Sequence, residues 1–141
     1  MNVFTARFPA MLESLTEIHQ YLQPILIAAR LNSSEVYAVQ LAVEEACSNV
    51  VEHAYGLLPG KEMELTVQDG EAVLVVLLRD WGEPVRPEAV VPQPVKKLVK
   101  AHARGGLGLH FMRQLMDEVN FERTQDGANL LRMAKYKRDT V

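Results

Sequence analysis

Residues 41–55 read LAVEEACSNVVEHAY, and polar side chains interrupt what is otherwise the pattern of a core helix. Glu45 and Asn49 are four residues apart, so on an α-helix they lie one turn apart on the same face. An asparagine oxygen can bind Mg²⁺ beside phosphate oxygens and waters, and a nearby carboxylate can orient or deprotonate a hydroxyl group. The spacing predicts either a magnesium nucleotide site or two solvated side chains on an outer helix face.

The composition limits the class of protein. We expect a single domain over residues 1–141, because this length is enough for one continuous core and 48% of the residues are hydrophobic. A formal net charge of -3 argues against nucleic acid as the main partner.

Cysteine usage and hydropathy indicate a cytoplasmic protein. The single cysteine, Cys47, excludes an intrachain disulfide and is interpreted as a small buried side chain. No apolar run approaches the roughly 20 residues that span a bilayer, and the first ten residues lack the layout of a signal peptide. We therefore expect no membrane association.

Alternation and helical spacing predict the element order strand, helix, helix, hairpin, long loop, helix, hairpin. This order favours an α+β fold, a two-layer α/β sandwich with a mostly antiparallel mixed sheet and three helices on one face. The strands are expected at residues 2–8, 62–68, 72–78, 120–124 and 129–136, and the helices over about 11–29, 33–55 and 109–116. Pro24 is expected to kink or split the first helix, and Asp69-Gly70 to form a two-residue hairpin turn.

The long loop has the composition of a lid. A loop of about 20 residues in a compact domain is usually functional or disordered. This one is rich in proline and lysine, and we place a lid over about residues 84–108. The residues concerned are Pro84, Pro87, Pro92, Pro94, Lys96, Lys97, Lys100 and Arg104.

Asp80-Trp81-Gly82 follows the strand expected at the centre of the sheet. A buried carboxylate there can accept a hydrogen bond from the exocyclic amine of adenine, and Gly82 would let a flat purine approach the backbone. The same three residues could simply form a turn. Trp81 is either a lip over the base or, as we favour, a surface aromatic side chain.

Gly105-Gly106-Leu107-Gly108 precedes the third helix. Glycines let backbone amides turn towards phosphate oxygens, and the helix N-terminus adds its positive end. Arg104 could reach a terminal phosphate, whereas the three lysines of the lid are more simply solvated. The pattern is neither a Walker loop nor a dinucleotide fingerprint. His53 is interpreted as a favourable partner of a helix C-terminus.

Taken together and in this order, these motifs resemble the GHKL ATPase superfamily. Within it the chain is most similar to the small bacterial anti-sigma-factor serine/threonine kinases. Residues 45–55 resemble the N box of that family, residues 80–84 its first glycine box and residues 105–109 its second, with Gly127-Ala128-Asn129 in a terminal hairpin. Glu83-Pro84 stands where larger members carry a second glycine, which we interpret as a subfamily mark.

The resemblance implies a role for each matching residue. It implies that Asn49 binds Mg²⁺, that Glu45 is the base acting on a substrate hydroxyl, and that Asp80 with Gly82 holds adenine. The phosphates of ATP would be bound by Arg104, Gly105, Gly106, Leu107, Gly108 and Leu109.

The resemblance also implies partners. These are an anti-anti-sigma protein with a STAS domain as phosphorylation substrate, a sigma factor that is sequestered, and a second copy in a homodimer that could form through the N-terminal edge strand. Two other functions stay open. One is a nucleotide-responsive binding module of the same fold without kinase activity, and the other is an interaction domain with a decayed site.

Overall fold

The computed structural model describes residues 1–84 and 106–138. Its elements in chain order are β1 (Asn2–Pro9), α1 (Ser14–Ala28), α2 (Ser33–Asn49), η1 (Val50–Ala54), β2 (Glu62–Asp69), β3 (Val73–Asp80), α5 (Gly106–Leu115), β4 (Glu118–Arg123) and β5 (Asn129–Tyr136). Most of the expected lid, together with Arg104 and Gly105, lies outside the described residues.

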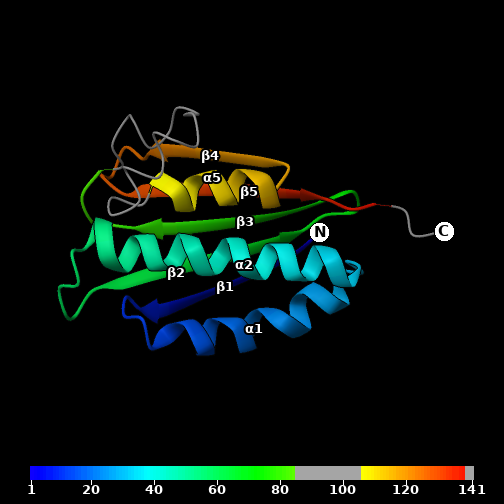
Figure 1. Ribbon diagram of the computed structural model, residues 1–141, viewed down its shortest axis with the longest axis horizontal. Helices are drawn as coiled ribbons and strands as arrows, with labels where there is room; N and C mark the ends of the chain where they lie inside the picture. Colours follow the sequence, from blue (N-terminus) through cyan, green and yellow to red (C-terminus); the bar gives the residue numbers. More distant parts are fainter. Residues whose placement is uncertain (85–105, 139–141) are drawn as a thin grey trace.

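The five described strands form one sheet in the order β1-β2-β3-β5-β4, with every pairing antiparallel. Helices α1, α2 and α5 cover one face of this sheet (Figure 1). The two-layer α/β sandwich predicted from the sequence is therefore confirmed. β1 lies at an edge as expected, and β3 is central.

The core lies between the helices and the sheet. Its largest fully buried side chains come from both layers, and packing them removes apolar surface from water, which is the main favourable term in folding. They are Leu22, Leu26, Met63, Leu65, Leu74, Leu78, Met112, Met133, Val39, Val43, Val51 and Val67.

Helix α2 begins with a capping box. The Asn32 side chain accepts a hydrogen bond from the Glu35 amide, and the Glu35 carboxylate accepts one from the Asn32 amide, both at 2.8 Å. This exchange satisfies two amides that have no partner within the helix. It fixes where α2 starts.

Helix α2 does not end as an ordinary α-helix. Residues 50–54 form a π-helical turn, η1, which ends where the Tyr55 amide donates to the Val50 carbonyl at 3.0 Å. Such wide turns are rare and frequently occur at functional sites. Gly56 follows with a φ of 59°, a left-handed conformation that terminates the helical segment.

Three local predictions need correction. Helix α1 begins at Ser14, and it is one helix with Pro24 inside it. The β2–β3 register pairs Asp69 with Leu74, so the two-residue turn is centred on residues 71–72 and not on Asp69-Gly70. The nearly continuous apolar run of residues 72–78 also predicts a strand covered on both faces, but only one face of the sheet carries described helices.

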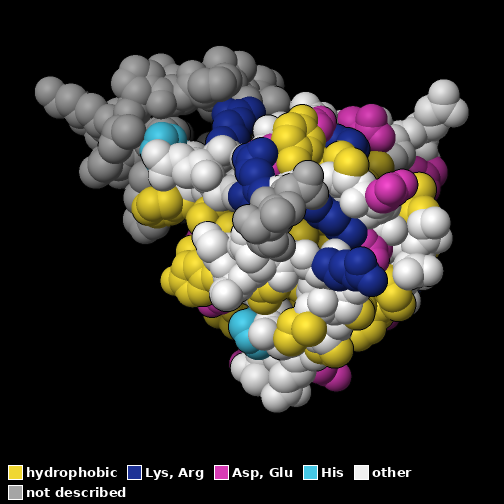
Figure 2. All heavy atoms as spheres, turned by 90° about the vertical axis from the view of Figure 1, so that its right-hand side faces the viewer, with side chains coloured by type: hydrophobic (Ala, Val, Ile, Leu, Met, Phe, Trp, Pro, Cys, Tyr) yellow, Lys and Arg dark blue, Asp and Glu magenta, His cyan; other side chains and the backbone are white. Residues whose placement is uncertain are grey.

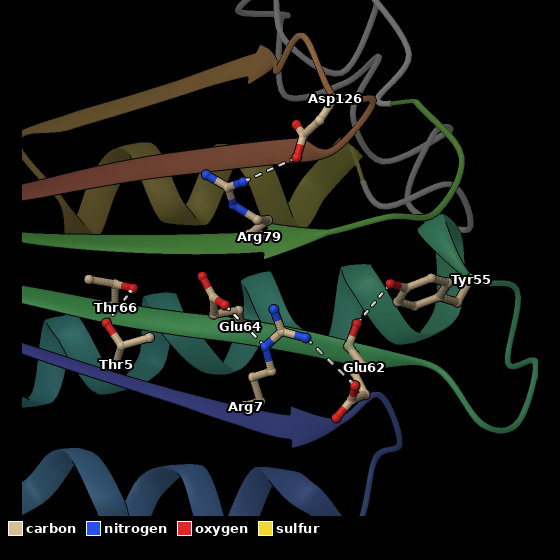
Figure 3. Close-up of polar contacts among 8 residues, drawn as sticks. All are labelled: Thr5, Arg7, Tyr55, Glu62, Glu64, Thr66, Arg79 and Asp126. Atoms are coloured by element: carbon tan, nitrogen blue, oxygen red, sulfur yellow. Dashed lines mark hydrogen bonds and ion pairs between the residues drawn. The ribbon is translucent and has the colours of Figure 1, made fainter.

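The open face of the sheet carries polar pairs between neighbouring strands (Figure 3). The Arg7 guanidinium lies 3.1 Å from the Glu64 carboxylate, and the hydroxyls of Thr5 and Thr66 are 3.1 Å apart. Among the residues that the structure describes, no helix is long and apolar enough to cross a membrane.

Candidate functional site

Glu45, Asn49 and Gly108 converge where α2 meets the first turn of α5. A Cβ atom added to Gly108 would lie 2.9 Å from Glu45 Oε2 and 3.2 Å from Asn49 Nδ2. Both side chains are half-buried. The predicted pairing of Glu45 and Asn49 on one face of α2 is thus observed, and that face points at the glycine-containing helix start.

Helix α5 is held in this position by its apolar face. Leu109, Met112 and Met116 are at most 4% exposed and join the core cluster that includes the inner side of α2. Because the Leu109 side chain is in the core, only its backbone could contribute to binding phosphate. For Gly106 and Leu107 the structure describes the backbone within α5 alone.

Asp80, the last residue of β3, is 4% exposed, and its Oδ1 atom accepts two hydrogen bonds. One comes from the Gly82 amide at 2.9 Å and the other from the Asn129 side chain at 2.8 Å. Among residues 1–84 and 106–138, no group donates to the second oxygen, Oδ2. A buried carboxylate with one oxygen fixed and the other uncommitted is suited to accept a hydrogen bond from a ligand.

Burial raises the pKa of the Asp80 carboxyl, whereas the hydrogen bonds from Asn129 and Gly82 and the charge of Arg123 oppose that shift. The net direction is upward, so the folded chain holds this charge at a cost in stability. Perturbed carboxyl groups of this kind gather at functional sites.

Asn129 has a role that the sequence did not predict. Its side-chain nitrogen donates to Asp80 Oδ1 and to the Glu83 carbonyl at 2.9 Å, and its oxygen accepts from Arg123 at 3.1 Å. Asn129 stands directly opposite Asp80 in the β3–β5 register. In the sequence, only its position after Gly127-Ala128 in the terminal hairpin indicated that Asn129 belongs to the site.

The turn after Asp80 is seated on the end of η1. The Glu83 amide donates to the Ala54 carbonyl at 2.8 Å, and a Cβ on Gly82 would clash with that same oxygen. Only glycine allows this approach. Asn49 directly precedes η1, so η1 connects the group formed by Glu45, Asn49 and Gly108 to the Asp80 turn.

Two further predictions are resolved by the structure. Trp81 is 39% exposed and has the Arg7 guanidinium 5.2 Å from its ring centre, so it is a surface aromatic side chain. Cys47 is fully buried, and burial followed by the charge of Glu44 raises the pKa of its thiol to about 12. A protonated, buried thiol is inert.

A separate hollow of about 350 Å³ lies at the opposite end of the sheet, near the chain termini. Figure 2 faces this end and shows lysine and arginine side chains mixed with acidic ones. Among the residues that line the hollow, Lys137 is already paired with Asp69 at 2.5 Å. The hollow therefore does not share residues with the Glu45, Asn49 and Asp80 groups.

The donor set fits a nucleotide with its metal better than a bare metal ion. The described part of the chain contains no group of three or more histidine, cysteine or acidic side chains that could hold a metal. Asn49 offers one neutral oxygen, so Mg²⁺ there would need phosphate oxygens and waters to complete its coordination. Gly108 packs closely against both side chains, so the backbone at the start of α5 lies next to the Asn49 oxygen.

Comparison with known proteins identifies the family to which this chain belongs. The family model described as histidine kinase-like ATPase domain matches residues 8–135. The chain belongs to this family. The GHKL resemblance predicted from the sequence is therefore confirmed.

Curated relatives of this histidine kinase-like ATPase domain are bacterial proteins named as serine-protein kinases or as an anti-sigma factor. The serine-protein kinase RsbW of Halalkalibacterium halodurans is 34% identical over 122 residues, which are 82% of this chain and 73% of that protein. The RsbW of Bacillus pumilus is 35% identical over 62% of this chain, and the chain spans only 58% of that protein. The anti-sigma F factor of Caldanaerobacter subterraneus is 29% identical over 77% of each protein.

A solved structure shares the fold. The RsbU and RsbW domains of a Mycobacterium tuberculosis protein superpose with a TM-score of 0.69 and 14% identity, over 99% of this chain and 34% of that one. At this identity the likeness shows the histidine kinase-like ATPase fold alone.

Proposed function

We propose that this chain is an ATP-dependent serine/threonine protein kinase. It phosphorylates an anti-anti-sigma partner with a STAS domain and sequesters a sigma factor when that partner is phosphorylated. The observation that carries the proposal is the meeting of Glu45 and Asn49 with Gly108 at the start of α5, with η1 connecting them to Asp80. The names of the curated relatives support the same activity.

In this proposal the Asp80 turn selects the base. Asp80 Oδ1 is occupied by the Gly82 amide and by Asn129, which leaves Oδ2 as acceptor for the 6-amino group of adenine. Guanine has a carbonyl oxygen at that position, and neither this oxygen nor the carboxylate can donate a hydrogen bond. The site should therefore prefer ATP to GTP by about 1–3 kcal/mol, the cost of an unpaired buried group.

The other end of the site holds the phosphates. Asn49 supplies an oxygen to Mg²⁺, and the backbone amides at the start of α5 face the phosphate oxygens. When bound, Mg²⁺ neutralises phosphate charge as the γ-phosphoryl group leaves ADP. Arg104 and Gly105, which precede the described part of α5, complete the phosphate contacts, and residues 84–108 form the lid.

Glu45 acts on the substrate hydroxyl. A carboxylate oxygen of Glu45 takes the hydroxyl proton while the serine or threonine oxygen bonds to the γ-phosphorus and the bond from phosphorus to the β–γ bridging oxygen breaks. Phosphoserine or phosphothreonine and ADP are the products. Most of the rate would come from positioning and charge neutralisation.

The partners are proposed from the likeness to serine-protein kinase RsbW and to anti-sigma F factor. The chain would work in the cytoplasm as a homodimer, with a STAS-domain protein and a sigma factor as its protein ligands. It would contact neither nucleic acid nor membrane directly. The β1 edge, which has no described neighbour on its outer side, is available for pairing with a second copy.

Two variants separate the proposed roles. Glu45→Gln keeps a side chain of the same size, so it should bind MgATP with unchanged affinity. It should transfer phosphate about 100-fold more slowly, or slower still, because a positioned base contributes at least that factor. Asn49→Ala should weaken binding of ATP only when Mg²⁺ is present. Calorimetric titration and transfer of label from ATP to the STAS partner measure both. Full kinase activity in Glu45→Gln would refute the assignment of the base.

One observation favours the alternative of a nucleotide-responsive binding module. Within residues 1–84 and 106–138, no side chain hydrogen-bonds to Glu45, whereas a catalytic base is commonly oriented by a second group. Nucleotide-dependent association with the STAS partner, without transfer of label, would support the module and refute the kinase.

A further inference from the structure

The Tyr55 hydroxyl joins three segments of the chain that are far apart in sequence. It donates a hydrogen bond to the Glu62 carbonyl at 2.7 Å and accepts one from the Trp81 amide at 2.9 Å. Tyr55 directly follows η1 as its C-cap, Glu62 begins β2 and Trp81 follows β3. The side chain is 6% exposed, so both bonds are shielded from water. Figure 3 shows the bond from Tyr55 to Glu62.

The protonated hydroxyl is the form that makes both bonds. Burial raises the pKa of the Tyr55 hydroxyl above its ordinary value, against the opposing effect of the hydrogen bond from Trp81. The hydroxyl therefore remains a donor towards Glu62 across the physiological pH range.

Tyr55 is the third contact between η1 and the turn that follows Asp80. The preceding residue, Ala54, provides the other two, through its carbonyl bond from the Glu83 amide and its close approach to Gly82. The three contacts engage residues 81, 82 and 83 in succession. Removal of the hydroxyl would free the end of the turn nearest to Asp80.

The hydroxyl lies in a position to control Asp80 without touching its carboxylate. Asp80 is joined directly to Trp81, so a displacement of the Trp81 backbone moves the Asp80 side chain with it. Asn49 immediately precedes η1, and Tyr55 immediately follows it. The hydrogen bond thus fixes the spacing between the base-binding turn and the residues proposed to face the phosphates.

We infer that Tyr55 is a positioning residue that aligns Asp80 for recognition of the purine amine and leaves the phosphate half of the site unaffected. This inference rests on the proposed function and goes beyond it by separating the two halves of the ligand. A purely structural tyrosine would weaken binding of every ligand in the same ratio.

The test uses Tyr55→Phe, which keeps the ring and removes the hydroxyl. Binding of MgATP, adenosine and magnesium tripolyphosphate is measured by calorimetry on the full chain at a temperature where it is folded. We expect about tenfold weaker binding of MgATP and adenosine, the size of one buried hydrogen bond, and unchanged binding of tripolyphosphate. An equal loss for all three ligands, or no loss for any, would overturn the inference.

Tyr136→Phe is the matched control. The Tyr136 hydroxyl also makes a 2.7 Å hydrogen bond, to the Glu118 carboxylate, but it lies on the exposed end of β5. Its removal should leave all three affinities unchanged. If the wild-type chain does not bind MgATP, the proposed function is refuted together with this inference. If the wild type binds MgATP but Tyr55→Phe leaves the ratio of the three affinities unchanged, this inference alone is refuted.

A second measurement on the wild-type chain keeps the inference testable if Tyr55→Phe does not fold. Hydrogen exchange at the Trp81 amide reports directly on its bond to Tyr55. Adenosine should slow this exchange at least fivefold, and tripolyphosphate should not change it. Equal effects of the two ligands would contradict the positioning role.

Discussion

Gly108→Ala tests whether the meeting of α2 and α5 is the centre of the site. The new methyl carbon would lie 2.9 Å from Glu45 Oε2, and ordinary contacts of this kind begin at 3.4 Å. Glu45 must therefore move by about 0.5 Å, and Asn49, whose Nδ2 would be 3.2 Å away, must also give way. A displacement of about 1 Å at a catalytic group can reduce turnover about 100-fold, so we expect this smaller shift to slow phosphotransfer about tenfold.

The fold should tolerate this change. Alanine is favoured over glycine within a helix by about 1 kcal/mol, and forcing a side chain off its rotamer costs about 0.5–1.5 kcal/mol. These two effects nearly cancel, because the groups displaced are the ends of flexible side chains. We expect a free energy of unfolding within about 1 kcal/mol of the wild type, measured by urea titration.

Gly60→Ala provides the opposite control. Gly60 has a φ of 77° and nothing within 4 Å of an added Cβ, so alanine there is strained without touching the site. It should lower stability by about 1–2 kcal/mol and leave phosphotransfer unchanged. Wild-type turnover in Gly108→Ala, or a loss of activity in both variants in proportion to their lost stability, would refute the proposed site.

Three further predictions follow from the structure. Asp80→Asn keeps an oxygen to accept from Gly82 and Asn129 but removes the buried charge, so it should lose MgATP binding. Because the pKa of the Asp80 carboxyl is raised in the folded chain, the stability of the wild type falls as pH rises through that pKa. In urea titrations the variant should therefore gain most in stability relative to the wild type at neutral pH. Asn129→Ala removes the donor to Asp80 and Glu83, so it should lower the free energy of unfolding by about 2–3 kcal/mol. It should also weaken the binding of MgATP about tenfold or more, measured by calorimetry. A variant with wild-type affinity would contradict this. The Cys47 thiol has a pKa of about 12 and no exposed surface, so it should resist iodoacetamide in the folded chain and react only on unfolding. Rapid alkylation of the native protein at neutral pH would be incompatible with this burial.

The sequence predicted most of the fold because its elements carry clear periodicity. The inward residues of β2, Met63, Leu65 and Val67, alternate with polar ones, and all three are buried. The wide turn η1 was not predicted, since residues 50–54 continue the helical pattern and nothing in their side chains distinguishes a π-helical turn from an α-helical one. The β2–β3 turn was placed two residues too early because Asp69-Gly70 is a common turn pair, while the observed register was fixed by the buried strands on either side.

The site was predictable where it depends on spacing within one element. Glu45 and Asn49 share a face of α2 because they are four residues apart. The glycines of residues 105–108 were predicted to face phosphate oxygens, and the close approach of Gly108 to Glu45 and Asn49 was not predicted. Asn129 and the Tyr55 hydroxyl were missed because their roles depend on contacts between elements. Asn129 faces Asp80 only through the β3–β5 register, and Tyr55 reaches Trp81 only from the end of η1.

The most direct measurement is a titration of the isotope-labelled chain with MgATP, followed through its backbone amide resonances. If one cleft holds both the base and the phosphates, the amides of Asn49, Gly82 and Gly108 should shift together along a single saturable binding curve. The amides of Thr5 and Thr66, on the open face of the sheet, should not shift. Shifts confined to one of the two groups, or a response at the open face instead, would contradict a nucleotide site built from α2, α5 and the Asp80 turn.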